Sequence, residues 1–202
     1  MGTEQLETAL NRNRKILAGL LAFQGDYQAH GRILKQLGIE IREVRNPDDL
    51  TDCSHLVIPG GESTTFLKLI EFMDISDAIR SHAEKEKPIL ATCAGLILIS
   101  NSVTGNSQKS LSILDASVER NAYGTQINSF ETDLDILALG EKPFHGVFIR
   151  APKIISTGKN VEILALHDGN PVLIRENNII GATFHPELSG DTRLHEWFIS
   201  LG

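Results

Sequence analysis

Apolar and polar positions alternate along the chain in a way that predicts strands and helices in turn. Residues 16–23 form an unbroken apolar run, typical of a buried strand, and residues 27–37 have a helical periodicity that ends at Gly38. Because such elements keep alternating, we expect a parallel sheet covered by helices on both faces. The first half contains further predicted strands at residues 39–44, 56–58 and 89–91 and predicted helices at residues 64–73, 76–85 and 94–99.

The second half of the chain is richer in predicted strands. Asp168-Gly169-Asn170 and Asn177-Asn178 are typical hairpin turns, so we expect hairpins between the last three strands. A last helix is predicted at residues 192–200. The predicted strands of this half are residues 113–118, 146–149, 161–166, 172–174 and 179–184.

Composition and charge narrow the classes of protein to be considered. At 202 residues and 22.2 kDa the chain is long enough for one sizeable core. We interpret residues 1–14, which carry no strong buried pattern, as an N-terminal extension and residues 15–202 as one domain. A net charge of −7 repels nucleic acid and anionic lipid, and the longest apolar run is far shorter than a bilayer span of about 20 residues. We therefore expect a cytoplasmic protein that binds neither nucleic acid nor membranes.

Three loops with unusual residues follow predicted strands of the parallel sheet. They are Gln24-Gly25-Asp26, Pro59-Gly60-Gly61-Glu62-Ser63 and Thr92-Cys93-Ala94-Gly95. Parallel sheets bind ligands beyond the carboxyl ends of their strands. The three loops are therefore expected to meet at one edge of the sheet and to form a site there.

Cys93 lies where a predicted buried strand passes into a helix, with the small residues Ala91 and Gly95 two positions before and after it. This spacing is typical of a nucleophile elbow, a tight turn that projects a nucleophile from the sheet. The helix N-terminus favours the thiolate and offers the amide of Ala94 to an oxyanion. The local sequence also leaves open an inert buried cysteine. Cys53 lacks such a turn, and we expect it to be a passive thiol.

The tripeptide His185-Pro186-Glu187 directly follows the predicted strand at residues 179–184. Proline favours an extended His185, so the imidazole and the Glu187 carboxylate are expected on the same side of the chain. Glu187 would then orient His185 as the base for Cys93. Alone, the tripeptide is more typical of a surface turn, but beside an elbow cysteine it indicates a catalytic triad.

Consecutive glycines mark the loop at residues 59–63. They allow the backbone to approach a ligand closely, so an amide of this loop is expected to complete an oxyanion hole. The alternative is a phosphate-binding turn, but the chain lacks the Gly-Lys-Ser/Thr ending and the dinucleotide fingerprint of such sites. His30, His145 and His195 lie near the motifs, yet no metal-ligand spacing is present. We predict no metal and no cofactor.

Six segments together carry a family resemblance: Ala22-Phe23-Gln24-Gly25-Asp26, Ile58-Pro59-Gly60-Gly61-Glu62-Ser63-Thr64, Thr92-Cys93-Ala94-Gly95-Leu96, Glu119-Arg120-Asn121, Gly146-Val147-Phe148-Ile149-Arg150-Ala151-Pro152 and Phe184-His185-Pro186-Glu187-Leu188. From about Ile16 to the C-terminus, the chain resembles the glutaminase subunits of pyridoxal 5'-phosphate synthase, a family of class I glutamine amidotransferases. The cysteine elbow with His-Pro-Glu is typical of the class, and the second and fifth segments are specific to the family.

The resemblance implies a fold, a reaction and a site. The fold is a flavodoxin-like three-layer α/β sandwich with a mainly parallel central sheet and additional strands in the C-terminal half. The reaction is hydrolysis of L-glutamine to L-glutamate and ammonia through a cysteinyl thioester. Gln24 resembles the position that couples partner docking to the oxyanion loop. The implied site residues are the triad Cys93, His185 and Glu187, the oxyanion amides of Gly61 and Ala94, and the glutamine contacts Gly61, Glu62, Ser63, Arg120, Ile149 and Arg150.

The resemblance also implies a partner. In this family the ammonia passes to a synthase subunit with a (β/α)8 barrel, which builds pyridoxal 5'-phosphate, vitamin B6, within a hetero-oligomer. Two alternatives stay open, a glutaminase subunit that serves another biosynthetic acceptor and a non-catalytic amidotransferase-like binding module. Two positions depart from the family, Ala91 where glycine is usual and Thr125 where a second arginine is common.

Overall fold

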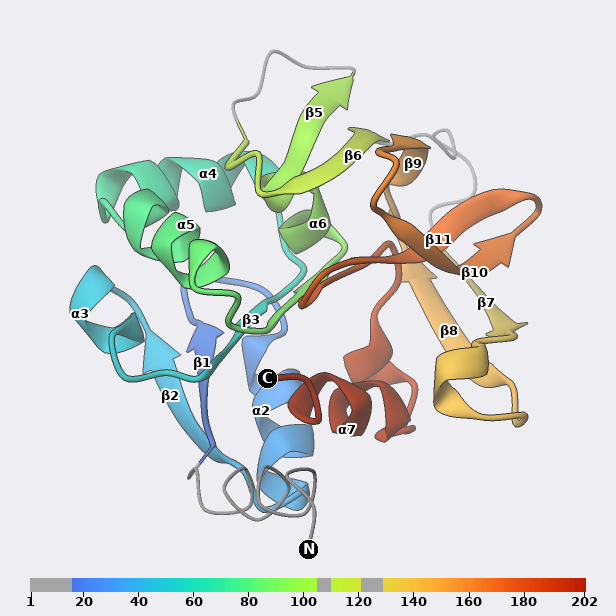
Figure 1. The fold of residues 1–202 in the computed structure, drawn as a ribbon, viewed down its shortest axis with the longest axis horizontal. Coiled ribbons are helices and arrows are strands. Elements are labelled where there is room, and N and C mark those ends of the chain that lie inside the picture. The colour runs from blue at the N-terminus through green and yellow to red at the C-terminus, as the bar shows by residue number, and fades with distance from the viewer. Residues whose placement is uncertain (1–15, 105–109, 121–128) are drawn as a thin grey trace, which may run out of the picture.

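A seven-stranded sheet forms the centre of the computed structural model, which describes residues 16–104, 110–120 and 129–202 (Figure 1). Its strands are β1 Leu17–Leu21, β2 Glu40–Val44, β3 His55–Ile58, β4 Ile89–Thr92, β10 Glu162–His167, β11 Asn170–Glu176 and β12 Ile179–Ala182. The strand order is β10-β11-β12-β4-β3-β1-β2. Neighbouring strands from β12 to β2 are parallel, whereas β11 pairs antiparallel with both β10 and β12. The predicted α/β fold with a mainly parallel sheet is confirmed.

Helices cover both faces of this sheet. They are α2 Tyr27–Gln36, α3 Pro47–Leu50, α4 Ser63–Phe72, α5 Ser76–Glu84, α6 Ala94–Ile99 and α7 Arg193–Ile199. Leu34 of α2 and Phe198 of α7 pack on one face, and Phe66 of α4, Ile79 of α5 and Leu96 of α6 pack on the other. In Figure 1, α2 and α7 accordingly lie together, apart from α4 and α5. Within the described ranges, no helix is long and apolar enough to cross a bilayer.

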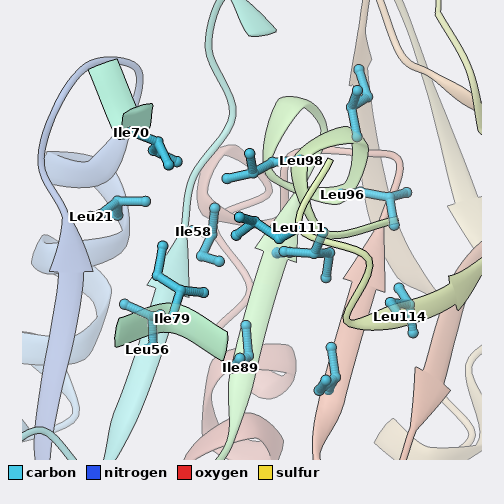
Figure 2. Close-up of a cluster of buried hydrophobic side chains, with 14 of the residues drawn as sticks. Leu21, Leu56, Ile58, Ile70, Ile79, Ile89, Leu96, Leu98, Leu111 and Leu114 are labelled. Atoms are coloured by element: carbon cyan, nitrogen blue, oxygen red, sulfur yellow. The ribbon is translucent and has the colours of Figure 1, made fainter. Parts of the chain in front are cut away.

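Successive residues of the central strands face opposite cores. Leu56 and Ile58 of β3 belong to the core beneath α4, α5 and α6, whereas Val57 between them belongs to the core beneath α2 and α7. Figure 2 shows the first of these cores, where Ile89 of β4 is the register partner of Leu56. Since a fully buried Leu or Ile contributes about 1.5–3 kcal/mol, the two cores hold the sheet between its helices.

Two smaller sheets extend the structure in the second half of the chain. One consists of β5 Ser100–Thr104, β6 Leu114–Glu119 and β9 Lys153–Thr157, and the other of β7 Ser129–Leu134 and β8 Phe144–Ile149. Two short 3-10 helices are η1 Leu137–Leu139 and η2 Pro186–Leu188. Phe144 and Phe148 of β8 pack into the core beneath α2 and α7, which brings the end of β8 to the carboxyl edge of the main sheet.

Most predicted elements are present within one or two residues of their expected ends. The hairpin between β10 and β11 is confirmed, with Asp168 and Gly169 at φ 47° and φ 72°. Six of the described elements were not predicted: α3, β5, β7, β9, η1 and η2.

Candidate active site

Cys93 occupies a strained turn between β4 and α6. Its φ of 48° and ψ of −105° form a conformation that a residue with a side chain keeps only where the surroundings enforce it. The Cys93 amide donates to the carbonyl oxygen of Ala182 at 2.8 Å, and α6 begins at Ala94. Gly95 permits close packing, because a Cβ there would lie 2.1 Å from the carbonyl oxygen of Ile58. The turn therefore has the geometry of a nucleophile elbow.

His185 and Glu187 reach the same point from the end of β12. The His185 amide donates to the carbonyl oxygen of Val147 in β8 at 2.8 Å, and η2 carries Glu187. His185 Nδ1 lies 2.7 Å from Glu187 Oε1, and both side chains are buried. Cys93 and His185 line the same cavity and both border Gly60, where an added Cβ would lie 2.5 Å from His185 Cε1 and 3.4 Å from Cys93 Cβ. Cys93 Sγ lies 3.8 Å from the carbonyl oxygen of Ile149. The three side chains form a continuous chain of thiol, imidazole and carboxylate.

His185 and Glu187 each stabilise the charged form of the other. Burial disfavours an imidazolium, yet the hydrogen bonds with Cys93 and Glu187 raise the pKa of His185 to about 10. Burial also opposes ionisation of Glu187, but the His30 and His185 rings hold the pKa of that carboxyl well below its ordinary value. At neutral pH the raised pKa of His185 therefore favours an imidazolium that is bonded to the Glu187 carboxylate and can stabilise a thiolate on the neighbouring cysteine.

A cavity of about 310 Å³ opens beside Cys93. This volume lies in the lower range of small-molecule sites. Its wall carries two arginines, Arg120 and Arg150, and two carboxylates, Asp26 and Glu62, so it presents charges of both signs. Of the site residues predicted from the sequence, those that line the cavity are Gly61, Glu62, Cys93, Ala94, Arg120, Ile149, Arg150 and His185.

Glu62 caps α4 and holds Arg120 at the helix end. Its carboxylate accepts the backbone N–H of Thr64 at 3.0 Å and that of Thr65 at 2.8 Å. Hydrogen bonds from the side chain and backbone of Thr65 lower the pKa of Glu62 to about 2. Arg120 Nη2 lies 3.5 Å from Glu62 Oε1, and Arg120 Nη1 donates to Thr64 Oγ1 at 3.2 Å. The Arg120 guanidinium is thus fixed in the cavity wall.

The three loops that were predicted to meet at the carboxyl edge do meet there. Gly25, at φ 75°, packs so closely that a Cβ would lie 1.8 Å from the carbonyl oxygen of Gly60. Gln24 Nε2 donates to the backbone carbonyl of Glu62 at 2.5 Å. A Cβ on Gly60 would in turn lie 2.5 Å from Cε1 of His185. The loop after β1 therefore contacts the loop after β3, which packs on the imidazole.

The other predicted site residues lie around this cavity. Gln24 and Glu187 are outside its wall, and each hydrogen-bonds a residue that lines it. Ser63 begins α4, but its side chain lies outside the described part of the chain, as does Thr125. Ala91 is fully buried in β4, where its methyl group is accommodated.

The sequence did not predict four further residues of this region. Asp26 and Ile97 line the cavity, and His30 and His195 lie buried behind Glu187. His30 Nε2 is 3.2 Å from Glu187 Oε2, and His30 Nδ1 is 2.9 Å from His195 Nε2. One signal was available for the histidines, because each occupies the apolar face of its amphipathic helix, where a polar ring needs a partner.

The fold is shared with proteins of known class. A solved structure described as a glutamine amidotransferase superposes with a TM-score of 0.85 at 45% identity, over 90% of this chain and 96% of that chain. PurLQS from Thermotoga maritima superposes with a TM-score of 0.68 at 18% identity, over 92% of this chain and 98% of that one, a likeness of fold alone. The class that fold and site define is the glutamine amidotransferases.

Within this class, the model of the SNO glutamine amidotransferase family matches residues 20–201, and the chain belongs to that family. The pyridoxal 5'-phosphate synthase subunit PdxT of Thermotoga petrophila is 48% identical over 183 residues, 91% of this chain and 97% of the relative. The subunit of the same name from Thermoplasma volcanium is 48% identical over 189 residues, 91% of this chain and 94% of the relative. The family resemblance of the sequence motifs is thereby confirmed.

Proposed function

We propose that the chain is the glutaminase subunit of a pyridoxal 5'-phosphate synthase and hydrolyses L-glutamine to L-glutamate and ammonia. The observation that carries the proposal is the chain of Cys93, His185 and Glu187 at the wall of a small cavity with charges of both signs. Family membership supports the same reaction.

The cavity wall has the groups that an amino-acid substrate needs. Arg120 or Arg150 would pair with the α-carboxylate of glutamine, and carboxylate or carbonyl oxygens of the wall would accept from its α-ammonium. Glu62 and the carbonyl oxygen of Ile149 are acceptors of this kind, the latter close to the thiol. The side-chain amide of glutamine would then lie against Cys93.

The reaction would proceed through a thioester on Cys93. The thiolate attacks the amide carbon, and His185 gives its proton to the departing nitrogen, which leaves as ammonia. Water, deprotonated by His185, then cleaves the thioester and releases glutamate. The amides of Gly61 and Ala94 would stabilise the oxyanion of both steps; as the first residue of α6, Ala94 has no intrahelical partner for its N–H.

Ammonia must reach its acceptor without meeting water, because at neutral pH it would become ammonium and lose its nucleophilicity. The relatives' name, synthase subunit, supports a partner that consumes it. We infer that this partner is a (β/α)8-barrel synthase subunit and that Gln24, which is bonded to the loop after β3, couples its docking to the oxyanion loop. The net charge of −7 supports a chain without nucleic-acid or anionic-membrane partners, and we propose a cytoplasmic location.

Replacing the thiol tests the proposed function. With the synthase subunit bound, Cys93→Ala should lower ammonia release from glutamine by several orders of magnitude, because the members of a triad act as a unit. The matched control is Cys53→Ala, a buried cysteine that does not line the cavity, which should keep wild-type activity. Equal activity of Cys93→Ala and wild type would contradict the mechanism, and a wild type that is inactive with its synthase would favour a non-catalytic module.

A synthase for another product is the competing acceptor. Reconstitution with the pyridoxal 5'-phosphate synthase subunit should yield pyridoxal 5'-phosphate from glutamine, a pentose phosphate and a triose phosphate. Failure of the two chains to associate, while Cys93-dependent glutaminase activity persists, would indicate a different acceptor.

A further inference from the structure

Two buried histidines continue the chain of polar groups beyond Glu187. His30 lies on α2 and His195 on α7, and neither side chain is exposed to solvent. His30 Nε2 is 3.2 Å from Glu187 Oε2 and 3.4 Å from Thr92 Oγ1. His30 Nδ1 is 2.9 Å from His195 Nε2. Both helices on this face of the sheet therefore supply a ring to the back of the triad.

The carboxylate of Glu187 has a different partner for each of its oxygens. Oε1 bonds His185, whereas Oε2 has no hydrogen-bond partner among the residues that the structure describes, although His30 Nε2 lies 3.2 Å from it. A buried carboxylate oxygen that accepts no hydrogen bond destabilises the folded state. Because the last side-chain torsion of a glutamate has no sharply preferred angle, the carboxylate would rotate away from His185 if Oε2 had no donor. A second carboxylate, Asp26, has an oxygen within 4.8 Å of this group, and its repulsion adds to the need for a donor. A proton on His30 Nε2 would meet that need.

The positions of the protons on the two histidine rings follow from His195, the last group of this hydrogen-bonded series. His195 Nδ1 is buried and has no partner within the described residues, and an unpaired N–H is rarer in protein interiors than an unpaired acceptor. Burial and the neighbouring His30 also lower the pKa of His195 to about 3, so this ring is neutral. With its proton on Nε2, His195 donates to His30 Nδ1. His30 then carries its own proton on Nε2, directed at Glu187.

We propose that His30 is a positioning residue that donates its Nε2–H to Glu187 Oε2 and, fixed by His195, keeps the carboxylate aligned with His185. The proposal rests on the proposed function in that the carboxylate is taken as the third member of a working triad. Because His30 acts on the carboxylate alone, it affects the charge and orientation of His185, and it makes no contact with glutamine.

The proton positions can be read in the unaltered protein. In the full chain labelled with [15N]histidine, long-range 1H–15N correlation spectra distinguish the two tautomers of each ring. The proposal expects a proton on Nε2 of His30, with the His30 and His195 signals assigned from single substitutions. A neutral His30 protonated on Nδ1 alone would direct a lone pair at the carboxylate and would overturn the proposal.

Kinetics of the complex with the synthase subunit give the second test. His30→Leu should lower kcat/KM for glutamine about 10-fold to 100-fold, as loss of a group that orients a catalytic residue does. KM should change little, and the pH at which iodoacetamide alkylation of Cys93 is half-maximal should rise. His30→Gln, whose amide N–H reaches a similar position, should restore most of the activity.

The matched control is His82→Leu. His82 is another buried histidine of an amphipathic helix, α5, and its Nε2 has no partner in the described ranges, but it does not line the cavity. This variant should keep kcat/KM within about two-fold and an unchanged alkylation profile. A folded His30→Leu variant that behaves like this control would overturn the proposal.

The two proposals can fail separately. If the wild-type complex releases no ammonia from glutamine, the proposed function fails, yet the tautomer of His30 and the alkylation profile of Cys93 still decide on its role. If His30→Leu does not fold, the spectra of the wild-type chain alone decide.

Discussion

Contacts with neighbouring residues hold the strained backbone of Cys93 in place. The positive φ of Cys93 costs about 1–3 kcal/mol for a residue with a side chain. Its amide is bonded to Ala182, and Gly95 leaves room for the carbonyl of Ile58, so the neighbouring strands fix both sides of the turn. A Gly95→Ala substitution would force a backbone shift at the site where the thiol is held.

Because Glu187 is buried and ionised, we expect the free energy of unfolding to fall at acid pH. Because the folded-state pKa of Glu187 lies below its ordinary value of 4.5, its stabilising contribution is complete above that pH and is lost as the pH falls further. Below about pH 4.5, the free energy of unfolding of the wild type should therefore fall with an added slope of up to about 1.4 kcal/mol per pH unit. Glu187→Gln should lack this added slope in urea unfolding.

The control for this measurement is Glu84→Gln, which removes an exposed carboxylate from the end of α5. It should retain the wild-type slope. Identical slopes in the wild type and in Glu187→Gln would show that the carboxylate is not held ionised by its neighbours.

Site residues in local motifs could be predicted from the sequence, whereas those that depend on tertiary contacts could not. Cys93 and the His185-Glu187 pair could be predicted because small neighbours and a proline determine their turns locally. Asp26 and His30 approach Glu187 only after segments far apart in the chain have folded together. No local pattern specifies that approach, although a histidine on an apolar helix face could have indicated a buried partner.

Among the elements, the buried central strands were predicted, whereas the polar strands β5 and β7 were not. The strands β1, β3 and β4 are apolar runs because helices cover both of their faces. By contrast, β5 and β7 are rich in Ser, Thr, Glu and Asp and keep much of their surface exposed, so neither run has a clear apolar pattern. Each pairs with the next described strand along the chain, β5 with β6 and β7 with β8.

The short helix α3 was missed although its cap is visible in the sequence. Asn46 Oδ1 accepts the Asp49 amide at 3.1 Å, and Asp49 Oδ2 accepts the Asn46 amide at 3.1 Å, with Pro47 at the first helical position. This reciprocal pair is a capping box. Four residues are too few for a periodic pattern, so the cap was the signal to use.

Removing this cap gives a prediction for α3. Asn46→Ala should lower the free energy of unfolding by about 1 kcal/mol, since one helix donor loses its acceptor. Glutaminase activity should stay unchanged because Asn46 is outside the cavity wall. Asp48→Ala, on the same exposed turn but outside the capping box, should cost less than half as much in the same urea titration; an equal loss would count against the cap.

For the whole molecule, the strand order determines which part of the N-terminal region is needed. β1 lies inside the sheet, paired with β2 on one side and β3 on the other, and its Leu20 and Leu21 are buried in the two cores. The interpretation of residues 1–14 as an extension stays a prediction. It can be tested because β1 begins only at Leu17.

Two truncations distinguish the role of residues 1–14 from that of β1. Deleting residues 1–14 should leave the melting temperature within a few degrees, because a change below about 1 kcal/mol moves it by about 2–4 °C in a domain of this size. Deleting residues 1–21 removes an interior strand and should abolish folding. Loss of the cooperative transition in the shorter deletion would place the first residues within the domain.

The contact between Gly25 and Gly60 has a consequence for how sequences of this family diverge. A side chain on Gly25 would strike the carbonyl oxygen of Gly60, and a side chain on Gly60 would strike the imidazole of His185. In an alignment of related sequences, changes at these two positions should therefore be rare, and a change at one should be accompanied by insertions or exchanges in both loops. The loops after β1 and β3 are therefore expected to change together among related sequences.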